Sequence, residues 1–250
     1  DLHTIGDQPS GTNINHNCGS LYPLKASSLV KKKKCDIGIC LDGDGDRVTI
    51  IDEKGRVLCG EEIIYILAKY YLAEKKIKKG SIIVTNEIAN YGLDISLKRL
   101  GLKLKRVKVG DKNILKEIID HKYFFGGEPS GHFIFRGDLL IGDGMATAIR
   151  ILTLILKEKK KLSVLNKGID LLEVMNINQI IDREKFYLVQ ESIYQKLNKL
   201  CQNLDIYYNI RPSGTEPLLR VNLQYDKRNI KVVTLNKLKK QIIKVITDAC

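Results

Sequence analysis

The sequence predicts α/β domains followed by a separate C-terminal α+β domain, and two observations support this. Between residues 81 and 121, apolar runs of strand length alternate with segments of helical periodicity, as in a layered α/β domain. After residue 162 the order changes to helix, strand, strand and helix, which indicates a smaller α+β domain. With 250 residues, 44% of them hydrophobic, the chain can bury such cores, which excludes a disordered or fibrous protein.

Each expected element follows from an apolar run and the residues that flank it. Two runs of strand length, 35–41 and 48–51, enclose an acidic loop. A helical pattern begins near Glu61 and is expected to continue through the lysines of residues 75–79 until Gly80. The later elements expected before residue 157 are strands at 81–85, 102–109, 123–125 and 132–135 and helices at 90–100, 111–121 and 144–156. Those expected beyond it are a linker at 157–161, helices at 184–200 and 229–249, and strands at 205–210 and 218–224.

The chain is strongly basic, with 42 Lys and Arg against 29 Asp and Glu and a formal net charge of +13. Such an excess suits nucleic acid, an anionic membrane or a phosphorylated small molecule. The lysine-rich runs at 31–34, 157–161 and 237–240 lack the interleaved aromatic residues that single-strand binding proteins use. They are typical of solvated helix ends, so we expect weak, non-specific nucleic-acid binding at most.

The six cysteines form no C-x-x-C pair and no Cys/His cluster of zinc-ligand spacing. This favours a reducing, cytoplasmic location. The apolar stretches, such as residues 149–156, are too short to cross a bilayer, and no segment resembles a signal peptide. We therefore expect no membrane partner.

The acidic loop between the first two strands holds three carboxylates at alternate positions. Asp42, Asp44 and Asp46 are separated by Gly43 and Gly45, which allow a tight turn. Three converging carboxylates repel one another unless a cation lies between them, and oxygen ligands favour Mg²⁺ or Ca²⁺. The alternative is an ordinary turn rich in Asp and Gly.

The same spacing mimics the start of an EF-hand, with Glu53 at the twelfth loop position. The sixth position of an EF-hand must be Gly, and here it is Arg47. Both flanks also read as strands rather than helices. A Mg²⁺ ion with few protein ligands keeps positions open for phosphate oxygens, so the loop is interpreted as catalytic rather than structural.

Two further loops carry polar side chains suited to a small ligand. Residues 126–132, Gly-Gly-Glu-Pro-Ser-Gly-His, gather a carboxylate, a hydroxyl and an imidazole, a set that suits sugar hydroxyls; a plain Gly-rich turn is the alternative. Residues 211–217, Arg-Pro-Ser-Gly-Thr-Glu-Pro, with Arg220 following, place two guanidinium groups around backbone N–H groups and two hydroxyls. That set suits phosphate, and a structural Pro/Gly loop is the alternative.

These three loops, in this order, resemble the metal, sugar and phosphate loops of the α-D-phosphohexomutases. Within that superfamily, the Pro-Ser-Gly-Thr-Asn-Ile-Asn stretch at 9–15, Cys-Gly-Ser at 18–20 and Val-Gly-Asp-Lys at 109–112 resemble the phosphoglucosamine mutases. The resemblance implies the phosphohexomutase fold, with mixed-sheet α/β domains and a C-terminal α+β domain. It divides the chain into the end of a second domain (1–57), a third domain (58–160) and a phosphate-binding fourth domain (161–250).

The resemblance also implies an activity: interconversion of glucosamine 6-phosphate and glucosamine 1-phosphate, on the route to UDP-N-acetylglucosamine and peptidoglycan. A phosphoserine transfers its phosphoryl group through a bisphosphate intermediate, with Mg²⁺ as the cofactor. The implied partners are a phosphorylated hexosamine and that intermediate, and a homodimer of the complete protein is compatible with the family.

Carried over position by position, the resemblance assigns a role to each candidate residue. The implied Mg²⁺ ligands are Asp42, Asp44 and Asp46, and the implied catalytic residues are Arg47, beside the transferred phosphate, and Lys108, in proton transfer. The implied contacts to sugar hydroxyls are Glu128, Ser130 and His132, and those to the other phosphate are Arg211, Ser213, Gly214, Thr215 and Arg220. For Lys108, a solvated strand lysine is the alternative.

No segment of the chain resembles the serine loop of the family's first domain. The chain is therefore expected to be a fragment that has little or no mutase activity alone. Three other hypotheses remain: a phosphoglucomutase/phosphomannomutase acting on neutral hexose phosphates, a non-catalytic remnant that binds phosphosugars, and a nucleic-acid binding protein.

Overall fold

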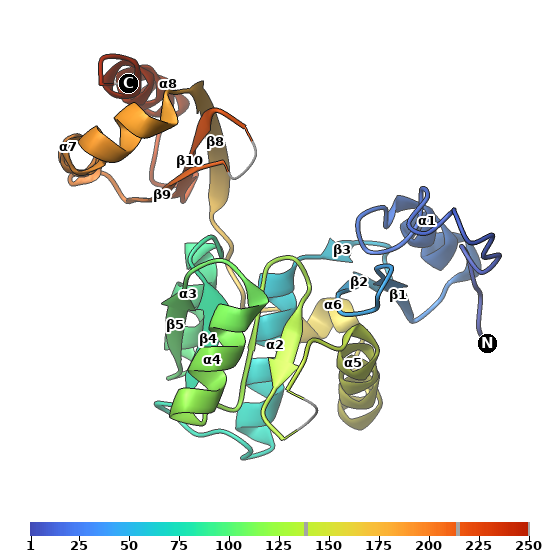
Figure 1. Cartoon of the computed structure of the whole chain (residues 1–250). Coiled ribbons are helices and arrows are strands. Elements are labelled where there is room, and N and C mark those ends of the chain that lie inside the picture. Colours follow the sequence, from blue (N-terminus) through green and yellow to red (C-terminus); the bar gives the residue numbers. More distant parts are fainter. Residues whose placement is uncertain (138–139, 214–215, 250) are drawn as a thin grey trace. The chain divides into compact units, whose positions relative to one another are not determined.

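The computed structural model describes residues 1–137, 140–213 and 216–249 of the chain. It divides into two compact units (Figure 1), Asp1–Asp170 and Leu171–Cys250. Each unit has its own hydrophobic core. Both units contain helices packed on sheets, which confirms the predicted α/β class. None of the described helices combines the length and the apolar character needed to cross a membrane.

The first sheet of the first unit is antiparallel, with three strands in the order β1-β2-β3. Its strands are β1 (Ile37–Leu41), β2 (Val48–Asp52) and β3 (Val57–Leu58), and its two covering helices are α1 (Leu24–Lys33) and α5 (Gly144–Glu158). Side chains of β2 alternate between the two faces. Ile51 packs with Val30 of α1, whereas Ile50 belongs to the same core as Ile151 of α5. The acidic loop therefore joins two strands that are held on both faces.

The second sheet of this unit is mixed, in the order β5-β4-β6-β7. Its strands are β4 (Ile82–Asn86), β5 (Lys103–Val107), β6 (Phe125–Gly127) and β7 (Phe133–Phe135). Strand β4 runs parallel to β5 and β6, whereas β7 returns antiparallel to β6. The carboxyl ends of β4, β5 and β6 consequently lie at one edge of the sheet, the usual place for a ligand site in such sheets.

Helices cover both faces of the mixed sheet. They are α2 (Gly60–Ala73) and α3 (Tyr91–Arg99) on one face and α4 (Asp111–His121) on the other. Accordingly, Ile83 of β4 belongs to the core that contains α2 and α3, and its neighbour Val84 packs with Ile114 and Ile118 of α4. The continuous apolar run of β4 follows from this burial on both faces.

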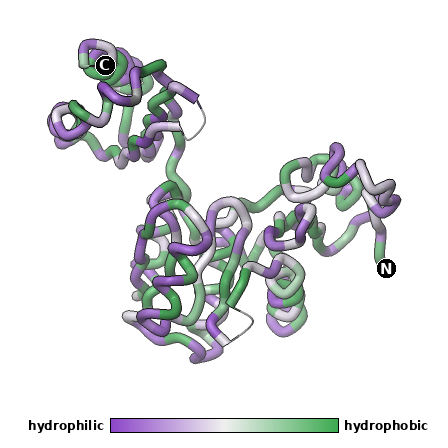
Figure 2. The backbone as a smooth tube through the Cα atoms, viewed as in Figure 1, coloured by the Kyte–Doolittle hydropathy of each residue, from purple (hydrophilic) through white to green (hydrophobic). Residues whose placement is uncertain are grey.

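Helix α2 is buried on nearly all sides, and Figure 2 shows the hydrophobic residues of this part of the chain. A helix that is apolar all round is expected in a core. It ends at Ala73, so the prediction that it continues to Gly80 was wrong. Lys75 adopts a left-handed backbone with φ 56°, and the N–H of Ile77 donates to the carbonyl of Tyr71, which turns the chain back.

The second unit is an antiparallel sheet covered by two helices. Its strands, in spatial order, are β8 (Glu173–Ile180), β10 (Leu218–Tyr225) and β9 (Ile206–Pro212), and its helices are α7 (Arg183–Cys201) and α8 (Val232–Thr247). Residues Leu219, Val221 and Leu223 of the central strand are buried against the helices. Their neighbours Arg220 and Asn222 lie on the other face of the sheet because strand side chains alternate.

The segment between α5 and β8 stays with the first unit. Short helix α6 (Leu162–Leu165) places Leu162 and Leu165 in the core of that unit. Residues 161–170, which the sequence analysis grouped with the last domain, therefore pack with the first unit. The division of this unit at residue 57 stays a prediction.

Candidate functional site

The three aspartates of the acidic loop converge. One carboxylate oxygen from each of Asp42, Asp44 and Asp46 lies within 4.8 Å of the others. Gly45 allows this turn with a left-handed backbone at φ 75°. Both flanking segments are strands, as expected, and Glu53 binds Ser163 through its side chain instead of joining the loop. The donor set, three carboxylates on a short loop, fits a hard divalent cation.

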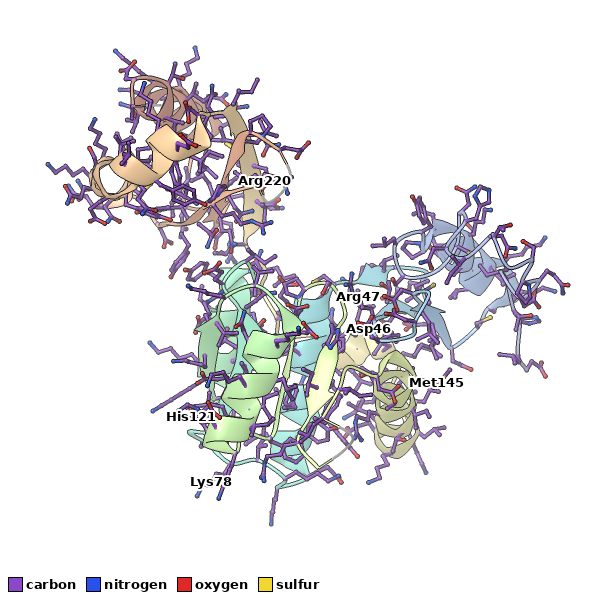
Figure 3. The ribbon with its side chains drawn as sticks, viewed as in Figure 1. Asp46, Arg47, Lys78, His121, Met145 and Arg220 are labelled. Atoms are coloured by element: carbon purple, nitrogen blue, oxygen red, sulfur yellow. The ribbon has the colours of Figure 1, made fainter. Side chains whose placement is uncertain are left out.

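Arg47 lies directly beside these carboxylates (Figure 3). Its backbone N–H donates to Asp42 Oδ1 at 3.1 Å, and its Nε lies 3.6 Å from both Asp42 Oδ2 and Asp46 Oδ1. The side chain is 44% exposed, so part of the guanidinium faces solvent. An arginine held in this way has donors left for an anion next to a bound cation.

The carboxyl of Asp46 lies close to several other charged groups. Burial and the closeness of the Asp42 and Asp44 carboxylates raise the pKa of its carboxyl, and His132 acts in the opposite direction. His132 Nδ1 lies 3.2 Å from Asp46 Oδ2. The structure thus brings His132, expected as a sugar contact, against the acidic loop.

Backbone hydrogen bonds tie the acidic loop to two other segments. The N–H of Val48 donates to the carbonyl of Gly131 at 3.0 Å, and Arg47 forms an antiparallel bridge with His132. The N–H of Gly144, at the start of α5, donates to the carbonyl of Gly45 at 2.8 Å. The acidic loop and the loop at 128–132 are therefore parts of one framework.

Glu128 is fixed at the carboxyl edge of the mixed sheet. It is 8% exposed, and its two carboxylate oxygens accept hydrogen bonds from Asn86 Nδ2 at 3.0 Å and from Ser130 Oγ at 3.2 Å. Sequence reasoning did not find Asn86. The feature that could have indicated Asn86 is its position as the last residue of a strand that runs parallel to β6.

Lys108 follows β5 at the same carboxyl edge of the sheet. Its side chain is exposed, and its backbone carbonyl accepts a hydrogen bond from Asn113 Nδ2 at 3.2 Å. Its position is compatible with either a ligand contact or the solvated lysine of the alternative interpretation.

In the second unit, Arg211 and Arg220 are direct partners across β9 and β10, so both lie on one face of the sheet. Arg220 Nη2 donates to Glu216 Oε2 at 2.8 Å and to Ser213 Oγ at 3.2 Å. Ser213 is only 3% exposed. Gly214 and Thr215, expected as phosphate contacts, lie outside the described residues. The described part is therefore a basic site that carries a hydroxyl, and in it the Glu216 carboxylate accepts a hydrogen bond from Arg220.

Residues 59–170 match the sequence model of a protein family, described as phosphoglucomutase/phosphomannomutase, alpha/beta/alpha domain III. The chain is also 37% identical over 252 residues to the phosphoglucosamine mutase of Ruminiclostridium cellulolyticum, an alignment that covers 98% of this chain. Residues 59–170 therefore belong to the phosphoglucomutase/phosphomannomutase family, and the chain is similar to a phosphoglucosamine mutase over almost its whole length. The matched domain comprises the mixed sheet, its helices and the loop that carries Glu128.

A second phosphoglucosamine mutase is similar to this chain over nearly the same residues. The phosphoglucosamine mutase of Clostridium beijerinckii is 40% identical over 228 residues, which are 90% of this chain and 51% of that protein. The alignment with the Ruminiclostridium protein covers 55% of that protein. The chain thus spans about half the length of these curated relatives.

Solved phosphohexomutase structures share the fold. A phosphoglucomutase/phosphomannomutase family protein from Burkholderia thailandensis matches with a TM-score of 0.72 at 17% identity, covering 92% of this chain and 50% of that one. The N-acetylphosphoglucosamine mutase of Aspergillus fumigatus, in complex with GlcNAc-6P and magnesium, matches with a TM-score of 0.70 at 16% identity, covering 93% and 57%.

Proposed function

We propose that this chain is the metal-, sugar- and phosphate-binding part of a phosphoglucosamine mutase. The observation that carries the proposal is the convergence of three carboxylates on a loop tied by backbone hydrogen bonds to the loop of Glu128. The relatives at 37–40% identity, which are named phosphoglucosamine mutases, support this choice over other hexose phosphates.

The acidic loop is the proposed Mg²⁺ site, with Asp42, Asp44 and Asp46 as ligands. Asp46 Oδ1 is buried and has no hydrogen-bond partner among the described residues, as a ligand atom would. When bound, Mg²⁺ supplies positive charge that stabilises a transferring phosphoryl group. Arg47 adds hydrogen-bond donors next to it.

The remaining residues bind and orient the sugar phosphate. Glu128 accepts hydrogen bonds from sugar hydroxyls, and Ser130 donates a hydrogen bond to one. Lys108 moves a proton at a sugar oxygen. The other phosphate is bound in the second unit by Arg211, Ser213, Gly214, Thr215 and Arg220. Phosphoryl transfer depends mainly on such positioning and charge neutralisation.

The nucleophilic serine is proposed to lie outside this chain, because no segment here resembles the phosphoserine loop. The proposal includes a cytoplasmic location, which the free cysteines Cys18, Cys35, Cys40, Cys59 and Cys201 support. A homodimer of the complete protein stays a prediction.

Metal and sugar-phosphate binding by the whole 250-residue chain test this function. Mn²⁺, an oxygen-seeking substitute for Mg²⁺, is titrated and followed by electron paramagnetic resonance. We expect Asp44→Asn to weaken Mn²⁺ binding by on the order of tenfold, because one ligand charge is lost. Asp7→Asn, an exposed substitution outside the acidic loop, is the control. Equal affinity of Asp44→Asn and the wild type would contradict the metal site.

Calorimetric titrations with the 6-phosphates of glucosamine, glucose and mannose test the substrate class. We expect glucosamine 6-phosphate to bind most tightly and Arg211→Ala to weaken it. Turnover to glucosamine 1-phosphate, with Mg²⁺ and a sugar bisphosphate, should be absent from this chain alone. Preference for glucose or mannose phosphate would favour the neutral-hexose alternative, and rapid turnover would refute an external serine.

A further inference from the structure

His132 is the point at which the loop at 128–132 meets the acidic loop. The residue is 5% exposed, and its Nδ1 lies 3.2 Å from Asp46 Oδ2. An ionised carboxylate and a bare ring nitrogen are both acceptors, so this contact needs a proton between them. With the proton on Nδ1, the imidazole faces Asp46 Oδ2 at ion-pair distance and restricts the rotation of that carboxylate.

The other ring nitrogen of His132 faces the backbone instead of open space. Nε2 is buried and has no hydrogen-bond partner among the described residues. It lies against Gly142, where an added Cβ would come within 2.1 Å of Nε2. Because residue 142 is a glycine, the imidazole ring of His132 fits between it and Asp46. The described geometry thus directs His132 toward the acidic loop.

Asp46 is held so that only one of its oxygens is committed to His132. Oδ2 lies 3.2 Å from Nδ1 of the imidazole, whereas Oδ1 has no hydrogen-bond partner among the described residues and lies 3.6 Å from Arg47 Nε. The antiparallel bridge between Arg47 and His132 keeps the two backbones in register. The imidazole therefore orients Asp46 from a rigid position.

We propose that His132 is a positioning residue for the metal loop, which holds Asp46 with Oδ1 presented to the cation. This inference rests on the proposed metal site and gives His132 a role other than that of a sugar contact. Partners that orient metal-binding carboxylates affect metal affinity strongly, and their loss typically costs about 10- to 100-fold.

Mn²⁺ affinity of the full 250-residue chain tests this role without any assay of turnover. We expect His132→Leu, which removes the donor, to weaken Mn²⁺ binding by about 10- to 100-fold. We expect His132→Asn to restore most of the affinity, because its amide nitrogen takes the place of Nδ1. His121→Leu is the matched control, since this exposed histidine pairs with Glu117 on α4, outside the acidic loop.

A second variant changes the position of the ring without changing the residue. Gly142→Ala places a methyl group 2.1 Å from the present position of Nε2, so it should displace the imidazole from Asp46 and also weaken Mn²⁺ binding. Circular dichroism and urea unfolding select the variants that remain folded. If His132→Leu does not fold, the comparison of Gly142→Ala with His132→Asn still tests the role of the imidazole.

The outcomes separate this inference from the proposed function. Failure of the wild-type chain to bind Mn²⁺ would remove the metal site itself. Tight Mn²⁺ binding by the wild type, with the same affinity in folded His132→Leu and Gly142→Ala variants, would overturn the positioning role and leave the metal site intact. If His132→Leu loses Mn²⁺ affinity and His132→Asn does not recover it, the size of the side chain and not its N–H donor is what matters. That result would also overturn the positioning role.

Discussion

At the scale of single residues, Glu128 and His132 are held by residues that lie far from them in the sequence. The acidic loop and the Glu128 loop stand out because several polar groups follow one another along the chain. Asn86 and Gly142 contact Glu128 and His132 from positions 42 and 10 residues away in sequence. Such contacts depend on strand pairing and loop return, which a single sequence does not reveal.

Asn86 provides the first prediction at this scale. Asn86→Ala leaves the buried Glu128 carboxylate without one of its two donors, so we expect the free energy of unfolding to fall by about 1–3 kcal/mol. Urea unfolding measures the change, with the exposed Asn203→Ala as control. A loss no larger than that of the control would show that this hydrogen bond does not hold Glu128.

Asp226 predicts a pH dependence. Side-chain hydrogen bonds from Arg228 lower the pKa of Asp226 to about 2, below its ordinary 3.8. A lowered carboxyl pKa adds stability above the ordinary pKa, and this stability is lost as the pH falls through the lowered value. We expect Asp226→Asn to be less stable than the wild type at pH 7 and to converge with it between about pH 4 and pH 2. Unfolding curves that stay parallel over that range would contradict the ion pair.

At the scale of elements, periodicity identified what was buried on a regular face. The strands and helices from β4 to α4 were predicted because their apolar residues recur with a clear period. Strand β8 was missed because, of its eight residues, only Ile177 is buried, and its outer face carries Asn176 and Asn178. An antiparallel strand with one solvated face normally alternates apolar and polar residues. In β8 this alternation is broken, because Gln179 shares the face of Ile177 and the exposed Val174 and Ile180 lie on the other face.

The link between the two loops of the site is a further prediction for these elements. Gly131 has φ 90°, and a Cβ there would lie 2.3 Å from the carbonyl oxygen of Val48. Gly80 has a similar φ of 85°, with no atom within 4 Å of the added Cβ. Gly80→Ala should therefore cost about 1–2 kcal/mol for its backbone alone. Gly131→Ala should cost about 1–3 kcal/mol more, because the loop must move away from β2.

Urea unfolding of both variants checks the difference, and Mn²⁺ titration checks its consequence for the site. We expect Gly131→Ala to weaken Mn²⁺ binding, because it displaces His132, which forms a bridge with Arg47 beside the acidic loop. We expect Gly80→Ala to leave Mn²⁺ binding unchanged. Equal losses of stability in the two variants would contradict a close approach between the loop and β2.

At the scale of the whole molecule, the sequence predicted two kinds of domain, and the structure contains two compact units with separate cores. The change of pattern after residue 162 revealed the second unit. It did not reveal that residues 161–170 pack with the first, because the burial of Leu162 and Leu165 depends on where the chain turns after α5. Contacts of that kind are tertiary and leave no periodic signal in ten residues.

Separate cores predict separate unfolding transitions. Leu93 of the first core and Leu223 of the second are both fully buried, so truncation of either to Ala should cost about 2–5 kcal/mol. In differential scanning calorimetry we expect Leu93→Ala to lower the temperature of one transition and Leu223→Ala that of the other, since neither core contains the residue removed from the other. A single transition that both variants lower equally would mean that the two units unfold as one. Mn²⁺ should then distinguish the transitions further, because a ligand stabilises only the unit that binds it and should raise the transition that Leu93→Ala lowers.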